Sequence, residues 1–443
     1  MEAGVSRTAR RKANILCETV EGRIVVVKTM IPEAKVCRAR ETKGVKHIFS
    51  VPVHSDIFIY AMLFFVTFVD FTNYIPSYSY VRYLCLLIIA LFLCLKFFAS
   101  KLSHFDLFSL VFLLFCGAVI LSSYFSRCDY KTRNPLLASI VFLGGLIEFL
   151  FVVKYAKIRG RIDVLLSVIF WLAVCVLFIN DALLFVAGDG NAIIGDKFHI
   201  AYFHIFVIAL TLLRATRRQK MKYAGFQVLL FCLVVMSFVV GIRVDCMTGV
   251  VGICLMVAWL ALCRVVPSFV RSPLTAVVAM LLSFLFMYVA LQIMNNAVVQ
   301  RIVEGTFSHD ATLSGRTHIF DVVDHMLKVR PVLGYGYGVS YEVLSGVLFI
   351  PDAQNGLAEW LIAGGWCAGV LIIASVFLAF KNSLHGTANM KYLDAIRVFI
   401  YTYICMATVE ITYNADFFAM VILLSILPET VSDNSSKESV EVV

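Results

Sequence analysis

The sequence predicts an all-α, polytopic integral membrane protein with about twelve transmembrane helices and a large external loop. Of the 443 residues, 61% are hydrophobic and only 15% are charged, whereas an average soluble domain is about 45–50% apolar and roughly 25% charged. The apolar residues also form blocks that are long enough for the ~20-residue helices that cross a bilayer core. This composition excludes a soluble enzyme, a disordered chain and a secreted disulfide scaffold.

Twelve apolar segments are expected to span the membrane as helices. They lie near residues 56–72, 80–98, 104–124, 136–156, 163–187, 198–213, 223–241, 248–263, 273–294, 356–380, 392–409 and 415–428. The expected organisation is a basic cytoplasmic tail at 1–55, helices one to nine within 56–294, an external loop at 295–355, helices ten to twelve within 356–428 and a cytoplasmic tail at 429–443.

Basic residues between the apolar segments predict the orientation. The N-terminal tail is rich in arginine and lysine, so the positive-inside rule places it in the cytoplasm. Alternation of the spans then puts three further basic loops inside, at 154–161, 214–222 and 264–271. One basic group falls outside and is the exception: Arg127, Lys131 and Arg133. The net charge of +9 is thus mostly a topology signal, and no nucleic-acid partner is expected.

The cysteines agree with a membrane protein. Most of the 13 cysteines lie inside apolar runs, where cysteine behaves as a small hydrophobic residue. No CxxC pair occurs, so neither a zinc site nor a redox motif is indicated. We therefore expect no metal and no cofactor.

The external loop contains a short amphipathic helix with a basic residue at its start. Apolar residues from Ile319 to Leu327 recur on one helical face. Arg316 lies in the first turn, where a cation opposes the helix dipole by about 0.3–1 kcal/mol. The same position combines free backbone N–H groups with a guanidinium, which suits a phosphate or a pyrophosphate. The alternative is that Arg316 extends to lipid headgroups or pairs with Asp310 or Asp321.

Two more cationic residues lie at the external ends of spans. Arg243 follows the seventh span, and the alternative to a functional role is an interfacial arginine paired with Asp245. Lys197 precedes the sixth span, which also carries Tyr202 and His204. A histidine inside a span is more often a packing residue than a ligand. Three cations at the outer ends of different segments nevertheless indicate a functional site more strongly together than each does alone.

Polar residues precede and enter the tenth span. Gln354 and Asn355 come directly before it, and Glu359 lies one turn inside it. A carboxylate at that depth is energetically expensive and indicates a functional site. Three other carboxylates raise the question of a functional site in the same way, and each could instead form an interhelical hydrogen bond: Glu148, Asp181 and Glu410. The upstream GYGYG at 334–338 lacks the Lys-Ser/Thr of a P-loop and is interpreted as a turn in which the backbone packs closely.

Two segments together carry a family resemblance. SGRTHIFDVVDHMLKVRPVLGYGYG followed by DAQNGLAEWLIAGGWCAG resembles the signature of the O-antigen ligase and polysaccharide polymerase superfamily. IIGDKFHIAYFHI and IRVDCMTGVVG are similar to earlier segments of exopolysaccharide and capsule polymerases of this group. The resemblance covers most of residues 190–375. It implies a GT-C-like, metal-independent membrane glycosyltransferase in the cytoplasmic (inner) membrane, with its active site on the external, periplasmic side.

The resemblance also implies a substrate and roles for individual residues. The donor would be a glycan linked to undecaprenyl pyrophosphate, with membrane lipids around it and a chain-length regulator and a flippase as partners. Arg316 and Arg243 would hold the donor pyrophosphate, with Lys197 as a weaker third cation. Tyr202, His204, Gln354 and Asn355 are the further substrate-binding candidates, and Glu359 is a catalytic candidate.

The sequence departs from the family pattern at one position. The histidine that usually precedes the asparagine is Gln354 here, and a glutamine cannot act as a general base. The base would then be Glu359, Asp352, Asp310 or His309, or the reaction would depend mainly on stabilisation of the leaving group.

Polymerisation of lipid-linked repeat units into a surface polysaccharide is the leading functional hypothesis. A ligase that transfers the glycan to a lipid acceptor is the alternative within the family. The rival classes are a transporter or flippase for a lipid-linked oligosaccharide and a structural membrane partner without chemistry.

Overall fold

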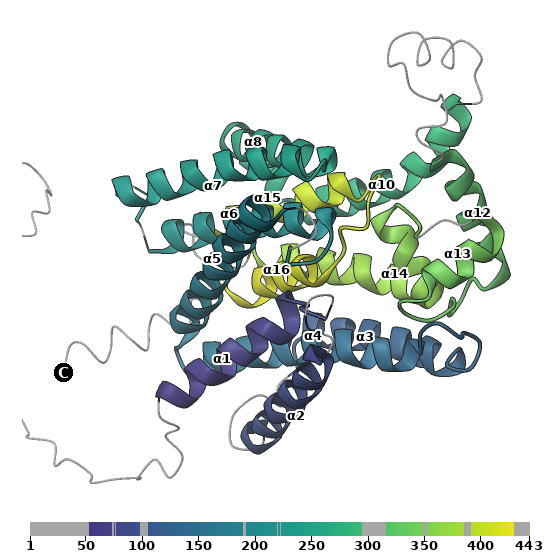
Figure 1. The fold of residues 1–443 in the computed structure, drawn as a ribbon, viewed down its shortest axis with the longest axis horizontal. Helices are drawn as coiled ribbons and strands as arrows, with labels where there is room; N and C mark the ends of the chain where they lie inside the picture. Colours follow the sequence, from purple (N-terminus) through teal and green to yellow (C-terminus); the bar gives the residue numbers. More distant parts are fainter. Residues whose placement is uncertain are drawn as a thin grey trace, which may run out of the picture. The chain divides into compact units, whose positions relative to one another are not determined.

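The computed structural model describes residues 53–72, 75, 77–97, 105–188, 192–218, 220–221, 223–294, 316–348, 352–384 and 391–428. Within these residues every regular element is a helix and no strand is present (Figure 1). The helices are α1 (Val53–Phe68), α2 (Tyr78–Phe97), α3 (Leu107–Phe125), α4 (Pro135–Ile158), α5 (Ile162–Ala187), α6 (Lys197–Arg217), α7 (Ala224–Arg243), α8 (Met247–Val265), α9 (Pro267–Arg271), α10 (Pro273–Met294), α12 (Arg316–Val329), α13 (Ser340–Leu348), α14 (Gly356–Asn382), α15 (Tyr392–Met406) and α16 (Ala415–Ile426). All of these helices belong to one compact unit.

Each of the twelve segments expected to span the membrane coincides with a helix. Eight helices in the described part of the chain are long and apolar enough to cross a bilayer: α2, α3, α4, α5, α6, α7, α8 and α14. Three more are apolar but shorter, namely α1, α10 and α16. α15 has only 15 residues and carries Asp394 and Arg397. A polytopic all-helical membrane protein is therefore confirmed, while the count of twelve spans remains a prediction.

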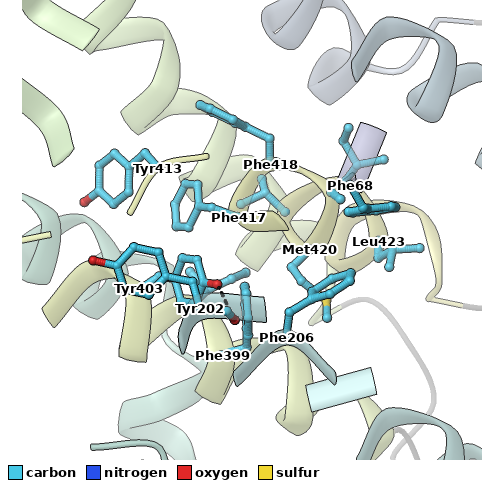
Figure 2. Packing of buried hydrophobic residues seen from close by; sticks show 14 of the residues in the cluster. Phe68, Tyr202, Phe206, Phe399, Tyr403, Tyr413, Phe417, Phe418, Met420 and Leu423 are labelled. Atoms are coloured by element: carbon cyan, nitrogen blue, oxygen red, sulfur yellow. Dashed lines mark hydrogen bonds between the residues drawn. The ribbon is translucent and has the colours of Figure 1, made fainter. Parts of the chain in front are cut away.

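Burial separates central helices from peripheral ones. α6 is buried along most of its length, and α16 packs against α4, α14 and α15. Figure 2 shows aromatic side chains from these central helices in contact, and the rings of Phe206 and Phe399 lie 6.1 Å apart. α2, by contrast, leaves Leu84, Leu87 and Leu91 exposed. Apolar side chains on the outside of a membrane protein contact lipid, so their exposure is the expected arrangement.

The amphipathic helix predicted in the external loop is α12. It begins at Arg316, and its buried face carries Ile319, Phe320, Val323 and Leu327. This face packs against α10 and α14. The helix is therefore attached to the helical bundle through the apolar face that the sequence predicts.

α14 is not a continuous helix. Its backbone breaks at Gly365, which has φ 64° and ψ −167°. The chain between α12 and α13 fills the break: the N–H of Tyr335 donates to the carbonyl of Ile362 at 2.7 Å, and the N–H of Trp366 donates to the carbonyl of Pro331 at 2.7 Å. Broken helices are stable at membrane depth only when the protein itself pairs the released backbone groups. This segment supplies those partners.

Two glycines make this close approach possible. A Cβ atom on Gly334 would lie 2.3 Å from the carbonyl oxygen of Ile362, and one on Gly365 would lie 2.1 Å from that of Val332. Both glycines also have a positive φ, which is unfavourable for residues with a side chain. The GYGYG segment is thus a turn with close backbone packing, as predicted, but its partner is a helix break that the sequence did not predict.

Candidate active site

A cavity of about 810 Å³ lies where the ends of several helices meet. Its wall combines the end of α1, the first turns of α2, α4, α6 and α14, the α3–α4 link, residues Tyr337 and Gly338, and the α15–α16 link. By the orientation that the basic loops predict, these are the external ends of the helices. The volume lies in the upper part of the range that ligand sites of proteins occupy, about 300–1,000 Å³.

Carboxylates predominate among the charged groups of the cavity wall. The acidic residues are Asp70, Asp196, Asp352, Glu359, Glu410 and Asp416, and the basic groups are Arg82, Arg133 and His199. Asp70 pairs with Arg82 at 2.6 Å, and Asp196 contacts His199 at 2.8 Å. Burial raises the pKa of Asp70, but hydrogen bonds from Thr72 and the charge of Arg82 outweigh it and lower the pKa below its usual value. Asp70 is therefore ionised at neutral pH.

Glu359 is a wall carboxylate with a hydrogen bond to each of its two oxygens. It lies in the first turn of α14 and lines the cavity. The hydroxyl of Ser340 donates to one carboxylate oxygen, and the N–H of Ala353 donates to the other at 3.3 Å. The two donors lie at different points of the chain before α14, one at the start of α13 and one directly before α14. Together they fix the orientation of the carboxylate at the cavity.

An aromatic wall lies next to Glu359. The ring of Tyr337 stacks on Phe142 with ring centres 4.9 Å apart, and on Trp360 with ring centres 5.5 Å apart. The indole N–H of Trp360 donates to the carbonyl of Tyr413 at 2.9 Å. Flat apolar faces beside carboxylates provide both packing and hydrogen-bonding groups for a ligand that carries hydroxyl groups.

Two buried hydroxyls of the wall have no hydrogen-bond partner among the described residues. They belong to Tyr202 and Tyr413, whose side chains line the cavity and are 3% and 1% exposed. Buried polar groups in native proteins are almost always paired. These two hydroxyls are therefore unusual polar groups beside the cavity.

Gln354 and Asn355 have different environments although they are neighbours. Gln354 lines the cavity and has a positive φ of 45°, a strained conformation that often occurs at functional sites. Asn355 is fully buried. Its side chain caps α14 by accepting from the N–H of Ala358 at 3.1 Å and donates to the carbonyl of Ser283 at 3.0 Å. Asn355 supports the wall and does not line it.

Lys197 and Arg243 lie beside the cavity and not on its wall. The ammonium of Lys197 donates to the carbonyl of Asp245 at 3.1 Å, which joins the start of α6 to the α7–α8 turn. Arg243 donates to the carbonyl of Leu184 at 3.2 Å and lies over the ring of Phe185. The structure thus groups two of the three predicted cations at the ends of α6 and α7. Arg316 begins α12, and its side chain, like His309 and Asp310, lies outside the described residues.

His204 lies apart from the other predicted substrate-binding residues. It is buried in the bundle, where its Nε2 contacts Asp181 at 3.2 Å and its Nδ1 contacts the hydroxyl of Ser237 at 3.0 Å. It joins α5, α6 and α7 and is not part of the cavity wall. The substrate-binding role of His204 stays a prediction; in the structure its ring nitrogens contact neighbouring helices.

Sequence reasoning missed a group of residues around the α3–α4 link. The carboxylate of Glu342 accepts from the N–H of Lys131 at 2.9 Å and from that of Thr132 at 3.1 Å, and Arg330 pairs with Asp129 at 3.2 Å. These contacts hold the link against the external segment. A signal was present in the sequence, since this link carries the basic residues that contradict the positive-inside rule.

Arg133 is the member of that link that reaches the cavity. A Cβ atom on Gly338 would lie 3.4 Å from the Cζ of Arg133, so the guanidinium packs against this glycine. Within the described part of the chain no carboxylate forms an ion pair with Arg133. The cavity wall therefore contains an arginine that forms no ion pair with any described carboxylate.

A comparison with protein families identifies the part of the chain that contains much of this site. Residues 243–373 match the family model of the O-antigen ligase. The match begins at Arg243 and extends through Gln354 and Glu359 to the broken part of α14, but it covers less than half of the chain. No curated protein and no solved structure is significantly similar to the chain. The match supports a membrane enzyme of the ligase or polymerase type that transfers glycans. Residues 243–373 are thus similar to the O-antigen ligase family, and this match supports the resemblance to the O-antigen ligase and polysaccharide polymerase superfamily.

Proposed function

We propose that this protein polymerises oligosaccharide repeat units linked to undecaprenyl pyrophosphate into a surface polysaccharide. It would do so as a twelve-span, GT-C-like, metal-independent glycosyltransferase of the cytoplasmic membrane. The observation that carries the proposal is the cavity at the external helix ends, which joins an oriented carboxylate, Glu359, to a wall of stacked aromatic rings. A sugar presents both hydroxyl groups and apolar ring faces, and this wall complements both.

The proposed chemistry uses Glu359 as the general base. Its carboxylate takes the proton of an acceptor hydroxyl while that oxygen forms a bond to the anomeric carbon of the donor glycan. The bond from this carbon to the pyrophosphate oxygen breaks, and undecaprenyl pyrophosphate leaves with the electron pair. By resemblance, Arg316 and Arg243 would stabilise the negative charge that builds up on the leaving group, with Lys197 nearby.

Gln354 and Tyr202 would position the acceptor in this mechanism. Both side chains line the cavity, and the hydroxyl of Tyr202 has no partner among the described residues. Because Gln354 replaces the usual family histidine and cannot accept a proton, the base must be another residue. Asp352 also lines the cavity, so the test compares it with Glu359.

The test is complementation of a deletion strain with variants of each carboxylate. Glu359→Gln should abolish long polymer although the protein reaches the membrane in normal amount, whereas Asp352→Asn should retain it. The base assignment fails if Glu359→Gln supports polymer of normal length and amount.

The deletion strain itself separates polymerase from ligase. The family match is described as an O-antigen ligase, so ligation to a lipid acceptor is the second candidate. Loss of a polymerase leaves single repeat units on the lipid carrier in the outer leaflet, whereas loss of a ligase leaves full-length polymer on that carrier. Repeat units that stay in the cytoplasmic leaflet would instead indicate a flippase and would refute both. A chain-length regulator and a separate flippase are the proposed partners of a polymerase.

A further inference from the structure

An apolar groove of about 350 Å³ runs between α1 and α2. Its lining is almost entirely apolar and includes Ala61, Phe65 and Val81. Few side chains of α2 are buried, and several apolar ones, such as Leu84 and Leu87, are exposed on the outside of the bundle, where a membrane protein contacts lipid. The groove is therefore positioned to receive an apolar chain from the bilayer.

Arg82 lines both this groove and the polar cavity. One guanidinium nitrogen pairs with Asp70, and another donates to the carbonyl of Val66 at 3.3 Å. The remaining nitrogen, Nε, is buried and has no partner among the described residues. Arg82 therefore lies between the groove and the polar cavity, and the headgroup of an apolar chain in the groove would lie beside its guanidinium.

Arg133 is a second arginine on the wall of the cavity. It forms no ion pair with a carboxylate in the described part of the chain, and it is held in place because Glu342 binds the link that carries it. A groove that ends at one guanidinium, with a second guanidinium on the wall of the adjoining cavity, complements an amphiphile with an anionic headgroup. Guanidinium groups bind phosphates through charge-assisted hydrogen bonds, and a diphosphate offers several charged acceptor oxygens.

We propose that the α1–α2 groove, Arg82 and Arg133 form a second polyprenyl-diphosphate site, with the isoprenoid chain in the groove, the diphosphate at the two arginines and the sugars in the cavity. The proposal rests on the proposed function, in which Arg316 and Arg243 hold the diphosphate of the donor. A polymerase joins two lipid-linked molecules, so the second site would hold the acceptor.

The location of the two sites agrees with two separate substrates. Arg243 ends α7, whereas Arg82 lies on α2, and these helices lie in separate regions with α6 and α16 between them (Figure 1). Arg82 of α2 lines the same cavity as Glu359, whereas no described residue of α7 lines it. An acceptor sugar that enters from the α1–α2 side would therefore reach Glu359 without passing the donor site.

The experiment measures how many undecaprenyl diphosphate molecules the purified full-length protein binds, by native mass spectrometry. Wild type should bind two. Arg133→Ala removes the unpaired charge and Ala61→Trp fills the groove, and each should weaken the binding of one molecule by roughly tenfold to hundredfold, as expected for the loss of a charge-assisted contact. Arg243→Ala should weaken the binding of the other molecule.

The matched controls lie on the same elements but outside the site. Arg127→Ala changes an arginine of the same link that contacts Tyr124, and Leu84→Trp adds an indole to an exposed position of α2. Both should still bind two molecules. Equal binding of phosphatidylglycerol, with the same losses in the variants, would show a general lipid site and overturn the proposal.

The outcome also separates this proposal from the proposed function. One bound molecule that is lost only in Arg243→Ala would overturn the second site and leave the donor site intact. Two molecules that bind equally well to wild type, Arg133→Ala and Ala61→Trp would also overturn it. No binding of undecaprenyl diphosphate to wild type would overturn both, whatever polymer the cells produce.

Discussion

Replacing Gly334 by alanine is expected to detach the external segment from the break in α14. The backbone at this position has φ +65°, and an added Cβ would lie 2.3 Å from the carbonyl oxygen of Ile362. A left-handed conformation costs a residue with a side chain roughly 1–2 kcal/mol. The clash also displaces the hydrogen bonds from Tyr335 to Ile362 and from Gly336 to Ala363, each with a net value of about 0.5–1.5 kcal/mol.

Together these effects predict a loss of about 2–5 kcal/mol in the free energy of unfolding. The measurement is unfolding of the purified protein by a denaturing detergent, followed by tryptophan fluorescence. Gly144→Ala is the matched control, because Gly144 lies within α4 and its added Cβ would meet no atom within 4 Å. Alanine in a helix interior is more favourable than glycine by up to ~1 kcal/mol, so the control should unfold at wild-type stability or slightly above it.

The substitution has a functional consequence as well. Tyr337 follows the same turn and stacks on Trp360 in the cavity wall, so movement of the turn disrupts the wall. Polymer made by Gly334→Ala cells should therefore be shorter and scarcer than polymer made by Gly144→Ala cells at equal protein amount. If Gly334→Ala is as stable as Gly144→Ala, the docking of this segment does not stabilise the break, and the reasoning is refuted.

Three further perturbations test other parts of the structure. The backbone N–H of the α3–α4 link and the hydroxyl of Thr132 lower the pKa of Glu342, so this contact stabilises the fold above pH ~4.5 and its contribution is lost as pH falls through the folded pKa. Glu342→Gln should therefore unfold more easily than wild type at pH 7, with a difference that shrinks as the pH falls below the usual pKa of a glutamate; a difference independent of pH would contradict this. Asn355→Ala removes the cap of α14 and should cost about 0.5–2 kcal/mol of unfolding free energy, which Asn355→Asp should partly restore; equal losses in both variants would exclude the cap as the cause. His204→Ala leaves Asp181 buried without its histidine and should lower the free energy of unfolding by about 1–3 kcal/mol, while the amount of polymer per folded protein stays near the wild-type level. A variant that is stable but inactive would instead support the predicted contact between His204 and the substrate.

The positions of the membrane helices could be predicted from the sequence because a membrane span is marked by neighbouring apolar residues. An apolar block of sufficient length has to form a helix in lipid, since its own backbone must pair its hydrogen-bonding groups. The expected segment 163–187 and the observed α5 (Ile162–Ala187) therefore nearly coincide. The amphipathic helix α12 was predicted for a similar reason, since one face repeats with helical periodicity.

The cavity wall was only partly predictable. Tyr202, Gln354 and Glu359 were predicted and do line the cavity, because polar groups next to a span are unusual and can be recognised one at a time. Tyr337 was not predicted, because an aromatic residue in an external loop is unremarkable until Phe142 and Trp360 pack against it.

What the sequence determines by itself is the membrane class, the positions of the apolar helices and the O-antigen ligase segment, because each depends on neighbouring residues or on a short ordered motif. What only the tertiary structure decides is which distant groups meet. Ser122 donates to the carbonyl of Ala363 across more than 200 residues, and Arg133 reaches a cavity whose wall also includes residues of α6 and α14. Such contacts depend on helix packing and on a break at Gly365 that is stable only when another segment pairs its backbone. The α3–α4 link could be recognised in the sequence because its basic residues do not follow the positive-inside rule. Only the structure shows that one of them, Arg133, lines the cavity.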